Sequence, residues 1–127
     1  MKRIIRLDCN IKSNNKFVGH HWSRGHRDKK LWLQHLFAAC SGNYPQANGR
    51  RMRVTITSYR PRKLDSDNMN GGCKKLLDAM KTLGMIVDDS PKWIEAEFRQ
   101  EKIAGQFSHV KIELEPIEEN QSGSGEG

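Results

Sequence analysis

The chain has 127 residues, of which 35% are apolar, and its 22 Lys/Arg against 15 Asp/Glu give a formal net charge of +7. This length predicts one domain with a modest core, and no apolar run approaches the ~18 residues of a membrane helix. The opening MKRIIRLDCN lacks the apolar core of a signal peptide. We therefore expect a cytoplasmic protein that makes no membrane contact.

Charge is distributed unevenly along the chain. Residues 1–63 carry 15 Lys/Arg against two acidic residues, a net +13, whereas residues 64–115 carry 7 against 10, a net −3. A basic half favours a polyanionic partner such as nucleic acid or anionic lipid, although many basic soluble proteins bind neither. We then expect the acidic half to bind a partner other than this polyanion.

The first half of the chain predicts a strand, a loop and a helix. Residues 3–9 alternate Ile and Leu with Arg loosely enough for a strand, and residues 10–25 form a polar, basic loop. Residues 27–40 form an amphipathic helix, which Ser41-Gly42-Asn43 ends. The expected apolar stripe of this helix, at spacings of three and four, is Leu33, Leu36, Phe37 and Cys40.

The second half predicts a strand, a helix and two further strands. Residues 51–59 alternate cleanly as a strand, a helix ending at Gly84 follows, and strands over 92–102 and 107–115 form a hairpin through IAGQ. The apolar stripe of that helix comprises Met69, Cys73, Leu76, Leu77, Met80 and Leu83. The order β-α-β-α-β-β predicts a small α+β domain over residues 1–115, with a mixed sheet packed by two helices. Residues 116–127 predict a disordered acidic, Gly/Ser-rich tail.

Cysteine and histidine give no metal pattern. Cys9, Cys40 and Cys73 are far apart and contain no C-x-x-C, which predicts small buried apolar side chains rather than a disulfide framework or a zinc site. His20, His21 and His26 share one loop, but their H-H-x₄-H spacing matches no usual zinc site. We expect His35 and His109 to pack against other side chains or to lie on the surface.

The stretch KLDSDNMNGGCKK, residues 63–75, concentrates carboxylates in a basic chain. An EF-hand beginning at Asp65 fails, because positions 5, 6 and 12 are Met69, Asn70 and Leu76. The simplest alternative is helix capping, with Asp67 at the N-cap and Asp65 solvated in the loop.

A cation site is the competing interpretation. At a strand end, Asp65 and Asp67 would point to the same side and repel by ~1–4 kcal/mol. Mg²⁺ or Mn²⁺ prefers such carboxylate oxygens. A second acidic pair, Asp88-Asp89, follows the helix and joins the first only if the loop after Gly84 folds back or a second subunit supplies one pair. A simple turn before Pro91 is equally compatible with this second pair.

The polar face of the helix offers a lysine. Helical spacing puts Asp67, Lys74 and Asp78 on one side, with Lys75 on the other flank. One interpretation is that Lys74 and Asp78 form an exposed ion pair. The other is that the Lys74 ammonium group faces the negative charge that develops on a phosphate. Gly71-Gly72 indicates that the helix starts after them or that the backbone approaches a neighbour closely, such as a phosphate at the N-terminal amides.

The stretch RPRKLDSDNMNGGCKKLLDAMKTLGMIVDDSPKW resembles the RusA family of Holliday junction resolvases of bacteria and their prophages. Residues 60–95 carry the pattern D-x-D-N, a lysine, D-A and a second D-D, and the opening strand with SNN at 13–15 is also similar. Residues 20–50 carry little resemblance. Leu64 stands where the family commonly has a basic residue, and the spacing between the aspartates and the lysine varies in the family.

The resemblance implies a homodimer of α+β subunits that binds four-way DNA junctions and cuts two opposed strands symmetrically in recombination and repair. It implies Mg²⁺, with Mn²⁺ as a substitute, held by Asp65, Asp67 and Asp89, and Lys74 as the essential lysine. Residues to consider beside these are Asn68, Lys75 and Asp88.

DNA contact is expected from basic and polar residues near this motif. The predicted phosphate contacts are Asn14, Asn15, Lys16, Arg60, Arg62 and Lys63, with Lys12 and the Arg50-Arg51-Arg53 group, and such contacts carry no base specificity. Phe17 or Trp22 could stack at the crossover or plug the core. Two alternatives stay open: a nuclease of flaps or forks, and a non-catalytic DNA-binding module whose aspartates cap a helix.

Overall fold

The computed structural model describes residues 2–9, 11, 23–104 and 107–117, with the backbone alone for 23–28. The elements are β1 (Arg3–Leu7), α1 (Ser23–Cys40), β2 (Met52–Arg60), α2 (Ser66–Thr82), β3 (Ile94–Lys102) and β4 (His109–Pro116). The predicted order and the small α+β class with a mixed sheet and two helices are confirmed. The expected residues 12–22 of the loop and 118–127 of the tail lie outside the described residues.

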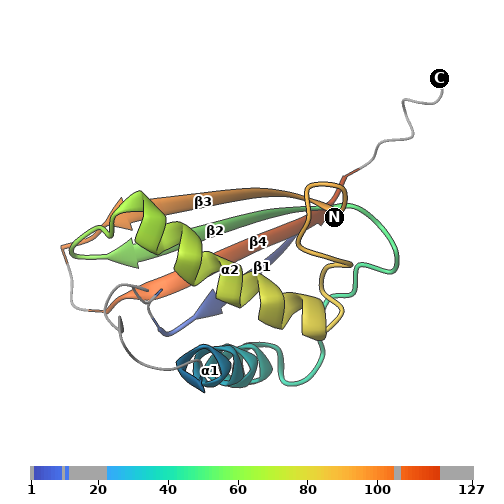
Figure 1. Cartoon of the computed structure of the whole chain (residues 1–127), viewed down its shortest axis with the longest axis horizontal. Helices are drawn as coiled ribbons and strands as arrows, with labels where there is room; N and C mark the ends of the chain where they lie inside the picture. Colours follow the sequence, from blue (N-terminus) through green and yellow to red (C-terminus); the bar gives the residue numbers. More distant parts are fainter. Residues whose placement is uncertain (1, 10, 12–22, 105–106, 118–127) are drawn as a thin grey trace.

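The four strands form one sheet in the order β1-β4-β2-β3. β4 runs antiparallel to both β1 and β2, whereas β3 runs parallel to β2 and is reached through α2. Both helices cover the same face of this sheet, and no described element covers the opposite face (Figure 1). The β2-α2-β3 crossover therefore sets the ends of α2 at opposite ends of the sheet.

The predicted hairpin between the last two strands is wrong. β3 and β4 are separated in the sheet by β2. Val110, Ile112 and Leu114 of β4 are at most 1% exposed, so this strand takes a central position that buries them. β3 has the sequence IEAEFRQEK, whose charged side chains are better solvated at an edge.

The core lies between the sheet and α2. Met52, Val54 and Ile56 of β2 are buried as the alternation predicted. From α2, the buried members of the predicted stripe are Met69, Cys73, Leu76, Leu77 and Met80, while Leu83 is half-buried at the C-cap. Gly84 follows with φ of +78°, a left-handed conformation that suits glycine, so its predicted role as the helix stop is confirmed.

Helix α1 differs from its prediction at both its start and its buried face. It begins at Ser23 rather than residue 27. Trp32 and Leu36 are buried, whereas Phe37 is 58% exposed and its ring lies beside Gly42, so the prediction of Phe37 in the stripe is wrong. The reason is that the stripe is centred on the Trp32–Leu36 pair, which are four residues apart on one face.

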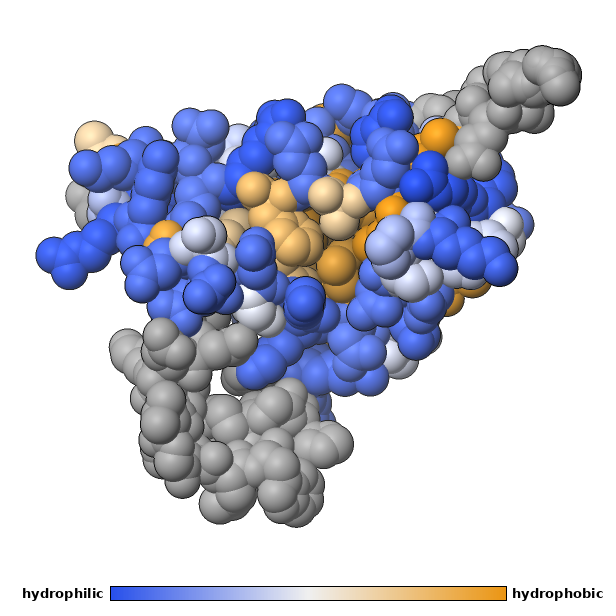
Figure 2. All heavy atoms as spheres, turned by 45° about the horizontal axis from the view of Figure 1, so that its top comes forward, coloured by the Kyte–Doolittle hydropathy of each residue, from blue (hydrophilic) through white to orange (hydrophobic). Residues whose placement is uncertain are grey.

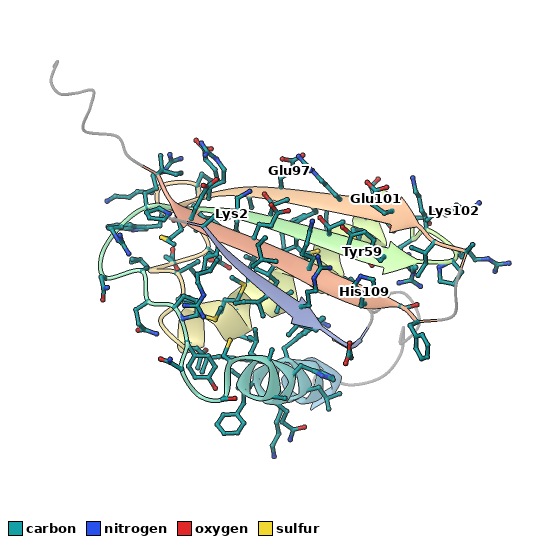
Figure 3. All side chains as sticks on the ribbon, turned by 180° about the vertical axis from the view of Figure 1, so that it is seen from behind. Lys2, Tyr59, Glu97, Glu101, Lys102 and His109 are labelled. Carbon is teal, nitrogen blue, oxygen red and sulfur yellow. The ribbon has the colours of Figure 1, made fainter. Side chains whose placement is uncertain are left out.

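The uncovered face of the sheet carries charged side chains that pair across strands (Figure 3). Lys2, the residue before β1, contacts Glu113 on β4 at 3.1 Å, and Arg53 on β2 contacts Glu95 on β3 at 3.2 Å. Tyr59 stacks on His109 with ring centroids 4.5 Å apart. Such cross-strand pairs let this face remain in water without a covering layer.

The cysteines are free thiols, as expected. Cys73 is buried, and this burial raises the pKa of its thiol to about 12, whereas Cys9 and Cys40 are half-buried. Across the described ranges, neither helix has the combination of length and apolar character required to cross a membrane.

Candidate functional site

The first aspartate pair lies where β2 passes into α2. Asp65 is the N-cap residue of α2, with φ −59° and ψ 152°, and its backbone carbonyl accepts the hydrogen bond of the Met69 N–H at 2.9 Å. Its side chain makes no capping hydrogen bond. Asp67, which was predicted as the cap, is instead in the first turn of the helix. The capping interpretation therefore does not account for the Asp65 carboxylate.

Both carboxylates face solvent. Asp65 and Asp67 are exposed, and within the described part of the chain neither side chain forms an ion pair. The helix dipole favours negative charge in this first turn, which partly offsets the mutual repulsion of the pair. Two acceptor side chains whose oxygens form no ion pair with any described residue thus lie two residues apart at one end of the sheet.

The loop before Asp65 is held in place by the side chain of Gln100 on β3. Gln100 of β3 accepts a hydrogen bond from the Leu64 N–H at 2.8 Å and donates one to the Leu64 carbonyl at 2.9 Å. These reciprocal bonds fix the residue before Asp65 against the carboxyl end of β3. Sequence reasoning missed Gln100, because a glutamine on an edge strand gives no signal of a partner 36 residues away.

Arg60 has a structural role in this loop. Its guanidinium donates to the Arg62 carbonyl at 2.7 Å and to the Ile11 carbonyl at 2.8 Å, and burial lowers its pKa. It thereby joins the segment after β1 to the end of β2. Arg62 and Lys63 are exposed, directly before the aspartates. Two exposed cations are therefore followed within a few residues by two carboxylates at this junction.

The other arginines predicted to contact DNA form contacts within the subunit. Arg51 and Arg53 both contact Glu95, at 3.4 and 3.2 Å, and Arg50 donates to the Ala47 carbonyl at 3.0 Å. The predicted residues Asn14, Asn15, Lys16, Lys12, Phe17 and Trp22, and the histidine loop, lie outside the residues whose side chains are described.

The second acidic pair lies beyond the C-terminal end of α2. Asp88 contacts Lys81 at 2.9 Å, and hydrogen bonds from Lys81 and Ser90 lower the pKa of its carboxyl group. The Trp93 and Ile94 N–H groups both donate to the Ser90 carbonyl, so the turn at this point runs from Ser90 to Ile94 and contains Pro91, whereas the prediction had placed a turn before Pro91. Asp89 is exposed beside this turn.

A groove of about 770 Å³ runs between α2 and β3. Lys74 and Asp89 both line it, so the structure brings these two predicted site residues to one hollow. Figure 2 shows apolar atoms exposed in a hollow between polar side chains. The apolar lining comes from Leu77, Pro91, Ile94, Ala96 and Phe98. The sequence analysis had placed Leu77 in an apolar stripe, but it did not predict a groove.

The surroundings of Lys74 differ from the simple ion-pair prediction. Asp78 contacts Lys29 of α1 at 3.2 Å rather than Lys74, which is exposed on the β3 flank of α2. The helix contains both Gly71 and Gly72, with Gly72 buried, so of the two interpretations of these glycines the one in which the helix starts after them is wrong. Asn68 is buried in the first turn, and Lys75 is half-buried.

The two acidic pairs do not meet within one subunit. They flank α2, whose 17 residues span roughly 25 Å, and the connection after Gly84 does not fold back to the first pair (Figure 1). Among the described residues, no group of three His, Cys, Asp or Glu side chains could hold a metal ion. Asp65 and Asp67 thus provide two of the ligands that a divalent cation needs. No third carboxylate among the described residues of the same subunit lies close enough to complete the site.

No protein-family model matches the sequence, and no curated protein matches it either. The resemblance to the resolvase family therefore depends on sequence motifs alone, chiefly the one over residues 60–95.

Proposed function

We propose that this chain is a Mg²⁺-dependent, structure-specific endodeoxyribonuclease that acts as a homodimer on branched DNA. Four-way junctions, cut symmetrically on two opposed strands, are the substrate we favour within that class. The observation that carries the proposal is the exposed Asp65-Asp67 pair, whose carboxylates neither cap the helix nor form ion pairs among the described residues. Hard divalent cations prefer such oxygens.

The residues beside the pair suit a phosphodiester. Arg62 and Lys63 are exposed next to the carboxylates, and their charges would bind the phosphates that flank the scissile bond. Asp65 and Asp67 would hold the cation, and the cation supplies an activated water and offsets charge on the leaving oxygen. Lys74 would stabilise negative charge on the phosphate as it develops.

A third carboxylate has to come from elsewhere, because Asp89 lies at the other end of α2. We propose that a second copy of the chain supplies it. Each half-site then has too little charge of its own to retain the cation, so cleavage would require the dimer. Two symmetry-related sites in one dimer would also account for paired cuts.

The test is incubation of the purified protein with a labelled four-way junction and with linear duplex, in Mg²⁺ and in EDTA. Paired symmetric incisions confined to the junction in Mg²⁺ are the expected result. Incision of flaps or forks at equal rate would change the substrate while retaining the nuclease. No incision of any substrate would contradict the proposed activity.

A non-catalytic DNA-binding module is the second candidate. It is favoured by one observation, namely that the described residues of a single subunit contain no three-ligand metal group. Binding would then depend on Lys and Arg alone. The two candidates differ in DNA affinity with and without Mg²⁺, since a module lacking a cation site predicts no gain from the ion, and both predict steep loss of affinity with salt.

A further inference from the structure

The backbone of Leu64 is bound by the Gln100 side chain in the way that a neighbouring strand would bind it. The carboxamide accepts from the Leu64 N–H at 2.8 Å and donates to the Leu64 carbonyl at 2.9 Å. Residues that face each other in an antiparallel ladder exchange the same two bonds. The Leu64 side chain also packs against the core. The chain is therefore fixed one residue before the N-cap of α2, where the loop passes the end of β3 (Figure 1).

This restraint takes the place of one that a helix cap normally supplies. The first N–H groups of a helix have no partner within it, and an N-cap side chain usually accepts from one of them, which keeps the first turn ordered. Asp65 is the N-cap residue, but its carboxylate makes no such bond, and its carbonyl instead accepts from the Met69 N–H at 2.9 Å. Because Gln100 holds the chain from outside the helix, the first turn stays ordered while the Asp65 oxygens take no part in the cap.

The Gln100 carboxamide binds the loop although a buried hydroxyl lies on the adjacent strand. Ser58 of β2 is the partner of Gln100 in the strand register, and its hydroxyl is buried and makes no hydrogen bond with any described residue. Buried polar groups without a partner are uncommon, and the places where a fold tolerates them are often functional. This arrangement indicates that the contact with Leu64 does more than satisfy a polar side chain.

We propose that Gln100 is a positioning residue for the Asp65-Asp67 pair. By holding Leu64 it fixes the backbone of Asp65, and with it the first turn that carries Asp67. Both carboxylates then keep one arrangement without using their oxygens to secure the helix. The consequence for cleavage rests on the proposed function, because it requires that the two aspartates bind the cation.

The chain offers a matched control at the other end of α2. The Gln46 carboxamide donates to the carbonyl of Leu83, the C-cap residue, at 3.0 Å. Gln46→Met and Gln100→Met therefore make the same chemical change, and each removes a glutamine contact with one end of the same helix. A purely structural role predicts similar effects of the two changes, whereas a positioning role predicts that only Gln100→Met disturbs the aspartates.

The first measurement is residue-resolved amide hydrogen exchange of the full chain, without metal or DNA. Gln100→Met should accelerate exchange of the Leu64 and Met69 N–H groups about tenfold, because the first loses its acceptor and the second lies in a turn that is no longer held. Gln46→Met should leave both rates at the wild-type value. Unchanged Leu64 exchange in Gln100→Met would overturn the inference.

Gln100→Glu tests the bonds themselves. In neutral solution the introduced carboxylate has no proton to donate to the Leu64 carbonyl, whereas in mild acid the protonated carboxyl group can both donate and accept, as the carboxamide does. Leu64 exchange, compared with wild type at the same pH, should therefore be fast in neutral solution and return to the wild-type rate in acid. Exchange that stays fast in acid would also overturn the inference.

The second measurement is the Mg²⁺ dependence of junction cleavage. Gln100→Met should raise the Mg²⁺ concentration for half-maximal cleavage about tenfold, the lower end of what outer-sphere partners contribute to metal affinity, and saturating Mg²⁺ should recover most of the rate. Gln46→Met should show the wild-type dependence, and equal shifts in the two variants would overturn the inference. A wild-type chain that cuts no DNA would refute the proposed function alone, because hydrogen exchange decides the positioning without metal or DNA.

Discussion

The two acidic pairs that flank α2 have similar sequences but different surroundings. Asp88 is held by Lys81 at 2.9 Å and by Ser90, the residue at which the following turn begins. Asp65 and Asp67 have no such side-chain partners among the described residues, although they follow two exposed basic residues, Arg62 and Lys63. One acidic residue thus supports the local structure, whereas the other pair keeps its oxygens available.

This difference indicates that two carboxylates close together in the sequence do not by themselves identify a functional site. Whether their oxygens already accept hydrogen bonds from other side chains is a better guide. A carboxylate that accepts hydrogen bonds from a lysine and a serine has little capacity left for a cation. The comparison separates Asp88 from Asp89 as well, because only Asp89 lines the groove with Lys74. It yields three further expectations.

The largest expected effect concerns replacement of the carboxylates by amides. Asp67→Asn should lower junction cleavage in Mg²⁺ on the order of 10³-fold, because loss of a cation ligand removes several kcal/mol of transition-state stabilisation. Asp88→Asn, the matched control, should retain most of the activity. Cleavage rates are measured with enzyme in excess over labelled junction. An Asp67→Asn protein that cuts at the wild-type rate would falsify the cation site.

A smaller effect is expected for the lysines of α2. Lys74→Ala should reduce cleavage on the order of 10²-fold if its charge faces the phosphate, with thermal stability unchanged since the side chain is exposed. Lys75→Ala is the matched control, because it makes the same change one residue along, on the other flank. Equal losses in both variants would mean that neither lysine acts specifically, and a larger loss for Lys75→Ala would reverse their roles.

The smallest effect is a pH-dependent change in stability. The hydrogen bond from Lys81 lowers the pKa of Asp88 below its ordinary value of 3.8, so the pair stabilises the fold above that value and loses its effect as pH falls through the folded pKa. Lys81→Gln should therefore be slightly less stable than wild type at pH 7 and equal to it in strong acid. Urea unfolding at both pH values measures this, with Lys30→Gln as the control. A difference that persists in acid would show that the ion pair is not its cause.

Local patterns in the sequence predicted most of the elements. Period-two alternation identified the buried face of β2, and the three-and-four spacing identified the stripe of α2 from Met69 to Met80. Gly84 marked the helix end because a positive φ suits glycine. These features depend on residues within a few positions of one another, and a chain of this length displays them directly.

The positions of elements relative to one another required the tertiary structure. Adjacency suggested a hairpin for β3 and β4, but burial of three apolar side chains drew β4 to the centre and left β3 at the edge. Phe37 fitted a helical stripe and yet faces solvent, because Trp32 and Leu36 decide which way α1 turns. Competition between distant segments for one core determines such outcomes.

The candidate site divides in the same way. The sequence by itself determined the chemistry, since Asp65, Asp67, Lys74 and Asp89 are the residue types that suit a cation and a phosphate. Only the tertiary structure decided that Asp89 shares a groove with Lys74, midway along α2, while Asp65 and Asp67 lie at the N-terminal end of the helix. The reason is that a parallel crossover carries the chain along the full length of the sheet before it returns.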